Sequence, residues 1–165
     1  MRRIGMLAVP GVLMLVMGMV SGAGAAEKDI EKIPSCQYCG MDREKFGSTR
    51  MIVEYANGTT IGTCSIHCAA VDLAQSFGKV IKSLKVADYR SGRLIDAENA
   101  FWVVGAGLPG VMAAKSRLAF ADKNEAEAFR KDKGGESADF NAAITSTYCD
   151  MWSDTQAIRS RRTKH

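Results

Sequence analysis

Residues 50–77 read RMIVEYANGTTIGTCSIHCAAVDLAQSF, two strand-like segments followed by a helical one. β-prone residues fill 50–55 and 59–63, and the Asn57–Gly58 pair between them is a strong signal for a β-hairpin. Over 66–77 the apolar spacing becomes helical, with one face formed by Ile66, Ala70, Leu73 and Phe77. The stretch therefore predicts a strand–strand–helix unit.

A similar unit is predicted further along the chain. After a third strand over 80–86, the segments 100–104 and 117–120 are strand-like, and the glycine-rich stretch 105–110 separates them. Asp122 and Glu125 resemble a capping box and begin a helix that runs through Lys131 and ends at Gly134–Gly135.

A final helix is expected over 138–152, with Phe140, Ile144, Thr147 and Met151 along one stripe. Two successive strand–strand–helix units and this last helix predict an α+β fold of two ββα-type modules plus a C-terminal helix.

The N-terminus has the features of a signal peptide. Arg2 and Arg3 precede an apolar run over 4–20, and small residues follow to Ala26. The alternative is an uncleaved membrane anchor, for which the apolar run is near the short end. No cysteine ends the run, so we expect an exported, periplasmic protein that is not a lipoprotein.

The charge of the remaining chain is nearly balanced. Arg2 and Arg3 account for two of the 22 basic residues, which leaves 20 basic against 18 acidic residues. This balance argues against a nucleic-acid partner. The basic residues after 152 are expected to form a solvated, frayed tail.

Four of the five cysteines fall in two close pairs. Cys36 and Cys39 form a C-x-x-C knuckle, and Gly40 permits the tight turn behind it. Met41 adds an uncharged thioether, a soft ligand that Cu(I) favours and zinc rarely needs. The fifth cysteine, Cys149, stands apart and is expected to be a spare thiol.

The second pair lies at the start of the helix predicted over 66–77. Cys64 and Cys68 project from the side opposite its apolar face, which is unusual for side chains that only fill a core. The helix dipole at Cys64 favours a thiolate. His67 lies between the two faces, and either a ligand or a structural hydrogen-bonding role fits it.

The cysteine pairs leave three interpretations open. They bind a metal, they form structural disulfides, or they exchange thiols with other proteins. No strand of a thioredoxin-like βαβ unit precedes Cys36, and Gly40 occupies the place where haem attachment requires histidine. A single histidine in the folded part offers little general-base chemistry, so we do not expect an enzyme.

These residues resemble the NosL family of copper-binding accessory proteins of nitrous-oxide reductase assembly. The resemblance covers most of residues 34–135, through the knuckle with Met41, the hairpin leading to Cys64, the stretch from Val111–Met112 to 119–121, and the helix after Asp122. It implies a periplasmic protein with two ββα-type modules, similar to the organomercurial lyase fold, that binds Cu(I) and delivers it to an apo-enzyme. Cys39 and Met41 match the family's Cys-Gly-Met, and Met112 matches a methionine of its second module.

The expected organisation is a signal peptide at 1–26, a linker at 27–35, a NosL-like metal-binding domain at 36–152 with modules at about 36–98 and 99–135, and a basic tail at 153–165. The expected function is that of a Cu(I) metallochaperone whose partner is a periplasmic copper enzyme, such as nitrous-oxide reductase, or its assembly machinery. The candidate ligands are Cys36, Cys39, Met41, Cys64, His67, Cys68 and Met112. The alternative function is that of a structural module that binds partners and is held together either by a zinc knuckle or by disulfides, so zinc is the alternative metal. A thiol–disulfide oxidoreductase is the further alternative. Membrane contact is expected only if the signal segment stays uncleaved.

Overall fold

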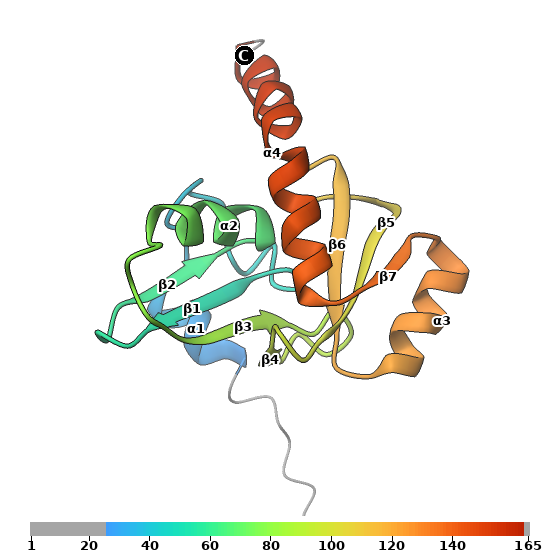
Figure 1. Cartoon of the computed structure of the whole chain (residues 1–165), viewed down its shortest axis with the longest axis horizontal. Coiled ribbons are helices and arrows are strands. Elements are labelled where there is room, and N and C mark those ends of the chain that lie inside the picture. The colour runs from blue at the N-terminus through green and yellow to red at the C-terminus, as the bar shows by residue number, and fades with distance from the viewer. Residues whose placement is uncertain (1–25, 164–165) are drawn as a thin grey trace, which may run out of the picture.

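The computed structural model describes residues 26–163, and the predicted signal peptide at 1–26 lies outside this range except for its last residue. A short helix, α1 (Ala26–Lys32), precedes the first sheet. This sheet contains β1 (Met51–Tyr55), β2 (Thr60–Thr63), β3 (Ile81–Ala87) and β4 (Leu94–Asp96) in the order β2-β1-β3-β4, and all neighbours are antiparallel. Helix α2 (Ile66–Gln75) packs on it (Figure 1).

The second sheet is built on the same plan. It contains β5 (Phe101–Pro109), β6 (Lys115–Phe120) and β7 (Glu136–Ala138) in the antiparallel order β6-β5-β7. Helix α3 (Lys123–Lys133) packs against it, and the long helix α4 (Phe140–Arg162) runs between the two modules (Figure 1). The predicted α+β fold of two ββα-type modules and a C-terminal helix is confirmed.

One apolar core is shared by both modules. Trp102 of β5 is almost fully buried and lies 6.1 Å, between ring centroids, from Phe140 of α4. Its indole N–H donates to the carbonyl of Ala97 at 2.9 Å, so burial leaves no unpaired donor on the ring. Around it pack core residues of both modules: Met51, Val53, Tyr55, Ile66, Ala69, Leu84, Val86, Ala119 and Ala143. This common core holds the loops of one module in place beside those of the other.

The hairpin and the capped helix form as their local sequences predict. Met51 of β1 pairs with Thr63 of β2, and Gly58 lies in the turn with a φ of 88°. The Asp122 carboxylate accepts hydrogen bonds from the backbone N–H groups of Asn124 and Glu125 at the start of α3, and Gly134 caps its end. These elements depend on neighbours in sequence, which explains why sequence patterns find them.

Several boundaries differ from the predictions. The glycine-rich stretch 105–110 is not a loop, because β5 continues to Pro109 through an irregularity after Val104, and Gly105 there has a φ of 74°. The short strands β4 and β7 were not predicted, since three residues carry no usable periodicity. Phe77 is not on the apolar face of α2, because the helix ends at Gln75 and leaves this side chain 93% exposed.

The last helix does not end at 152, because α4 continues to Arg162, and the basic tail is helical rather than frayed over residues 153–162. Within residues 26–163, no helix is both long and apolar enough to cross a membrane.

Candidate metal centre

The Cys36–Met41 turn forms a closed knuckle. The backbone N–H of Cys36 donates to the carbonyl of Met41 at 2.8 Å, and that of Gly40 donates to the carbonyl of Cys36 at 2.9 Å. Gly40 has a φ of 75°, a backbone conformation that residues with a Cβ rarely adopt. The glycine that follows the C-x-x-C pair is therefore required by the turn.

The knuckle is docked on the end of β2. The backbone N–H of Gln37 donates to the carbonyl of Gly62 at 3.1 Å, and the Gln37 side-chain oxygen accepts the Gly62 N–H at 2.9 Å. Two residues beyond Gly62 the chain reaches Cys64, just before α2 begins. The docking thus brings the first cysteine pair next to the second.

A buried arginine ties the knuckle to the rest of the first module. Arg43 is 0% exposed, and its guanidinium donates to the carbonyls of Ile33 at 2.6 Å and Thr63 at 3.2 Å. It also forms an ion pair of 2.8 Å with Asp29 of α1, and Asp29 pairs with Arg50 at 3.0 Å. Burial without this carboxylate would be costly, so α1 supplies the charge that allows Arg43 to enter the core. Nothing in the local sequence signals this role.

The four paired cysteines converge on one point. The sulfurs of Cys36, Cys39, Cys64 and Cys68 all lie within 4.8 Å of one another. The Cys39 and Cys64 sulfurs are 3.5 Å apart, and those of Cys64 and Cys68 are 3.8 Å apart. Four sulfurs arranged tetrahedrally around an ion, each about 2.3 Å from it, lie about 3.8 Å from one another. The cysteines are free thiols, and their spacing fits the coordination of a single metal ion.

Hydrogen bonding divides the thiols into acceptors and donors. The pKa of Cys36 is lowered because Cys39, and then Cys64 and Cys68, donate to its sulfur. The pKa of Cys39 falls to about 7, since its bond to Cys36 raises it but the bonds from Cys64 and Cys68 lower it more. The pKa values of Cys64 and Cys68 are raised, first by their hydrogen bonds to Cys36. A cation that binds all four sulfurs must release their remaining protons.

Two methionines lie against the cysteine cluster. Met41 from the knuckle and Met112 from the loop between β5 and β6 are partly buried, and both pack against the cluster that the buried cysteines form. Cys39 is also partly exposed, whereas the other three cysteines are buried. The thiol of Cys39 and the two thioethers therefore form the more accessible side of the cluster.

The loop that carries Met112 is held at both ends. The Ser65 hydroxyl donates to the carbonyl of Val111 at 3.0 Å, and the backbone N–H of Ala114 donates to the Asp154 carboxylate of α4 at 2.9 Å. Met112 itself has a φ of 58°, in the left-handed region that costs a residue with a Cβ about 1 kcal/mol or more. This strain is stored where the second module contributes its side chain to the cluster.

A tyrosine pair links the knuckle to α2. The hydroxyls of Tyr38 and Tyr55 donate to the two oxygens of the Asp72 carboxylate, at 2.6 and 2.5 Å. Burial, and then the hydrogen bond to Asp72, raises the pKa of Tyr55 to about 12, so its phenol stays protonated and donates the hydrogen bond at neutral pH. Tyr38 lies between the two knuckle cysteines, and Asp72 lies one turn after Cys68. Sequence reasoning did not single out this network.

The remaining candidate residues lie outside the sulfur cluster. His67 is buried, and its Nδ1 lies 3.8 Å from the Asp154 carboxylate. Burial lowers the pKa of His67. Its ring is not among the four side chains whose ligand atoms converge, although it lines a cavity with Cys39 and Met112. Cys149 is exposed on α4 and apart from the cluster, as expected of a spare thiol.

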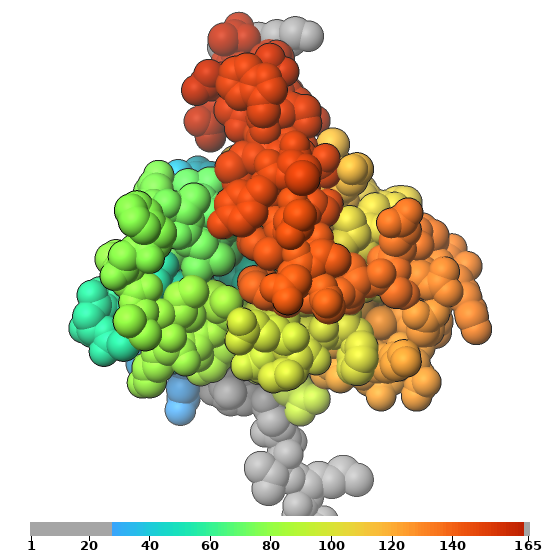
Figure 2. All heavy atoms as spheres, viewed as in Figure 1, coloured from blue at the N-terminus to red at the C-terminus, as the bar shows by residue number. Residues whose placement is uncertain are grey.

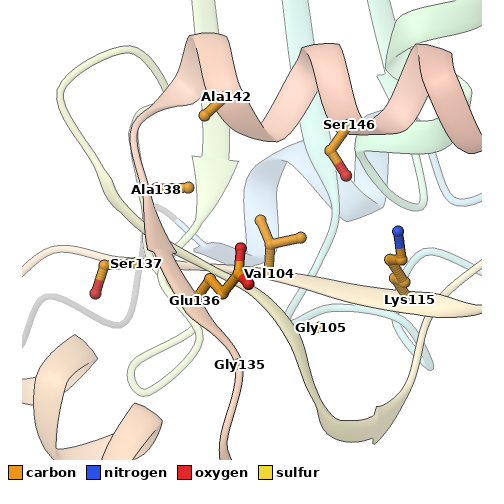
Figure 3. Close-up of a pocket in the computed structure, with 9 residues that line it drawn as sticks. All are labelled: Val104, Gly105, Lys115, Gly135, Glu136, Ser137, Ala138, Ala142 and Ser146. Atoms are coloured by element: carbon orange, nitrogen blue, oxygen red, sulfur yellow. The ribbon is translucent and has the colours of Figure 1, made fainter.

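A larger cavity lies elsewhere in the second module. It has a volume of about 600 Å³ and lies between β5, β7 and the first half of α4 (Figure 3). Its lining includes Lys115, Glu136 and Ser146, but none of the described residues around it carries a thiol, thioether or imidazole. This cavity therefore lacks the soft donors that are found at the knuckle.

Comparisons with known proteins show the family and support the fold. The model of the NosL family matches residues 27–149. Among solved structures, the copper chaperone NosL from Shewanella denitrificans is similar, with a TM-score of 0.53 and 22% sequence identity. The similarity covers 65% of this chain and 87% of that chain, and at this identity it supports the fold. No curated protein matches the chain.

Proposed function

The chain belongs to the NosL family, and we propose that it is a non-enzymatic chaperone that binds Cu(I) outside the cytoplasm and passes it to a copper enzyme. The observation that carries the proposal is the convergence of four cysteine sulfurs within 4.8 Å, with the thioethers of Met41 and Met112 against them. Thiolates and thioethers are soft donors, and Cu(I) favours such donors, the uncharged thioether included.

The accessible side of the cluster supports release as well as capture. Cys36, Cys64 and Cys68 are buried, whereas Cys39, Met41 and Met112 are partly exposed. A partner's sulfur approaching from this side replaces one exposed ligand at a time, while the buried thiolates retain the ion. Uncharged thioethers dissociate more readily than thiolates would, and transfer depends on that step. The proposed acceptor is a periplasmic copper enzyme such as nitrous-oxide reductase, or its assembly machinery.

Metal titration tests the assignment. We expect reduced protein, prepared without oxygen, to bind Cu(I) tightly, and Met41→Ala to weaken Cu(I) far more than Zn(II), because zinc does not need the thioether. Met151→Ala, which removes a methionine of α4 that is not packed on the cluster, serves as the matched control. Equal loss of both metals on Met41→Ala would count against copper as the cargo.

A structural zinc site is the second candidate, and the burial of three of the four thiols favours it. Closed four-cysteine sites are typical of structural zinc. Protein isolated from the periplasm and analysed for copper and zinc together separates the two functions. One tightly held zinc that Cu(I) does not displace would support the structural role, and two intact disulfides without metal would support a stapled module.

Two further expectations accompany the proposal. A thiol oxidoreductase would reduce insulin, and we expect no such activity. If residues 1–26 form a cleaved signal peptide, N-terminal sequencing of the exported protein will begin at Glu27.

A further inference from the structure

The last turns of α4 carry three exposed arginines. Arg159, Arg161 and Arg162 are exposed, and no carboxylate within residues 26–163 pairs with them. A basic helix end is common, because cations interact favourably with the helix dipole. The surroundings of these three side chains point to an additional role.

The acidic residues of α4 are already engaged further back along the helix. Asp150 pairs with Arg117 at 2.7 Å and with Lys115 at 3.1 Å. Asp154 is buried and accepts the backbone N–H of Ala114. The end of α4 therefore keeps its full positive charge. Figures 1 and 2 show that this end projects beyond the rest of the described chain, where a partner can reach it.

The arginines lie around two cavities beside the cysteine cluster. A cavity of about 330 Å³ is lined by Met41 and Met112 together with Arg161 and Arg162. A neighbouring cavity of about 220 Å³ is lined by Cys39 and Met112 together with Arg159 and Arg162. The three partly exposed sulfur side chains through which metal exchange is proposed therefore line the same cavities as the arginines.

Helix geometry explains how one segment borders both cavities. At about 100° per residue, Arg161 lies on one side of the inward stripe that contains Asp154 and Ile158, and Arg159 and Arg162 lie on the other side. Asp154 anchors this stripe to the Met112 loop through Ala114. The position of the arginines relative to the cluster is therefore set by the packing of α4.

We propose that Arg159, Arg161 and Arg162, named here the arginine rim, dock an acidic protein surface that surrounds the copper site of the partner. The inference rests on the proposed function. Opposite charges around the two metal sites steer the encounter and align them, and the exposed thiol and thioethers then lie opposite the partner's ligands. The rim falls outside residues 27–149 that the NosL family model matches.

An acidic protein fits these observations better than an anionic membrane. The charges are grouped around the openings to Cys39, Met41 and Met112, where only a partner with its own metal ligands gains from contact. A lipid surface covering these openings would block the exchange.

Transfer of Cu(I) to two synthetic peptides tests the rim. Both peptides carry the same Cu(I)-binding methionine and cysteine core, flanked by glutamates in one and by lysines in the other. At low salt we expect transfer from the full-length protein to be about tenfold faster to the acidic peptide, and added salt to reduce this ratio. In the triple variant R159Q/R161Q/R162Q the ratio falls close to one, while the equilibrium affinity for Cu(I) is unchanged.

A matched variant controls for net charge. K32Q/K123Q/K131Q removes three exposed lysines of α1 and α3 and is expected to keep the tenfold ratio. The proposal would be overturned if the arginine variant kept the tenfold ratio of the two transfer rates, or if both variants reduced this ratio equally, while Cu(I) still bound to the protein. Arginine-dependent binding to anionic vesicles without a peptide preference would overturn it in favour of a membrane. Absence of Cu(I) binding by the unsubstituted protein would instead refute the proposed function, and the arginine rim with it.

Discussion

Tyr38→Phe tests whether the hydrogen bond from the knuckle to α2 prepares the metal centre. Tyr38 and Tyr55 donate to the same carboxylate, that of Asp72, which is 1% exposed. Only Tyr38 belongs to the knuckle, so Tyr55→Phe removes an equivalent bond without releasing a ligand-bearing segment. The two substitutions form a matched pair.

The expected loss of stability is similar for both variants. A hydrogen bond to a charged group contributes about 1.5–3 kcal/mol, and each variant leaves the buried Asp72 carboxylate with one phenol partner. We expect the free energy of unfolding of the reduced, metal-free protein to fall by about 2 kcal/mol in each case. Urea denaturation followed by fluorescence measures it.

The pH dependence of this contribution follows from the tyrosine pKa. The pKa of Tyr55 is raised from 10.0 to about 12, so the protonated phenol is favoured in the folded state. The stabilisation is therefore complete below pH 10 and is lost as the pH rises through about 12. Measurements near pH 7.5 see the full effect.

The Cu(I) affinity should separate the two variants. In Tyr38→Phe the knuckle gains freedom, and binding must order it again at the expense of affinity. If ordering the knuckle again costs about 1.4 kcal/mol of binding free energy, the dissociation constant rises about tenfold, whereas Tyr55→Phe leaves the dissociation constant unchanged. Competition with a Cu(I) chelator measures both. An equal rise in the two variants, or none in Tyr38→Phe despite its loss of stability, would refute the reasoning.

Substitutions at Met112, Gly110 and Arg43, each with a comparison variant, test the packing around the centre. Met112→Gly should be more stable than Met112→Ala by about 1 kcal/mol in urea denaturation, because the φ of 58° strains any residue with a Cβ, and a reversed order would contradict the strain. Gly110→Ala places a Cβ 2.3 Å from the carbonyl oxygen of Lys115 and should lower the melting temperature by several degrees, whereas Gly78→Ala, with open space around it, should be neutral. Arg43→Lys should cost about 3 kcal/mol in the same denaturation assay, since one ammonium cannot reach the acceptors of the buried guanidinium, and the exposed Arg93→Lys should cost almost nothing; similar values for both would disprove the anchoring role of Arg43.

Local sequence patterns predicted the elements whose geometry depends on close neighbours. The hairpin at Asn57–Gly58, the helix cap at Asp122 and the turn at Gly40 all follow from residues within a few positions of one another. Phe77 was predicted on the apolar face of α2, and the prediction is wrong because this helix ends at Gln75 although the helical spacing of apolar residues continues beyond it.

The cysteine pairs were recognisable in the sequence because C-x-x-C and the four-residue spacing of Cys64 and Cys68 each place two sulfurs on one side of the chain. Their chemical character, soft and suited to a metal, follows from residue type alone. The sequence by itself therefore determined two α+β modules and two candidate half-sites.

Only the tertiary structure decided that the half-sites form one cluster and which residues surround it. Segments up to 76 positions apart in the sequence come together through three contacts: the docking of Gln37 on Gly62, the burial of Arg43 with Asp29, and the approach of the Met112 loop. Such contacts are set by the shared core, where shape and buried charge select one arrangement that no local periodicity encodes. The same packing carries the end of α4, expected to be a frayed tail, to the rim of the metal centre.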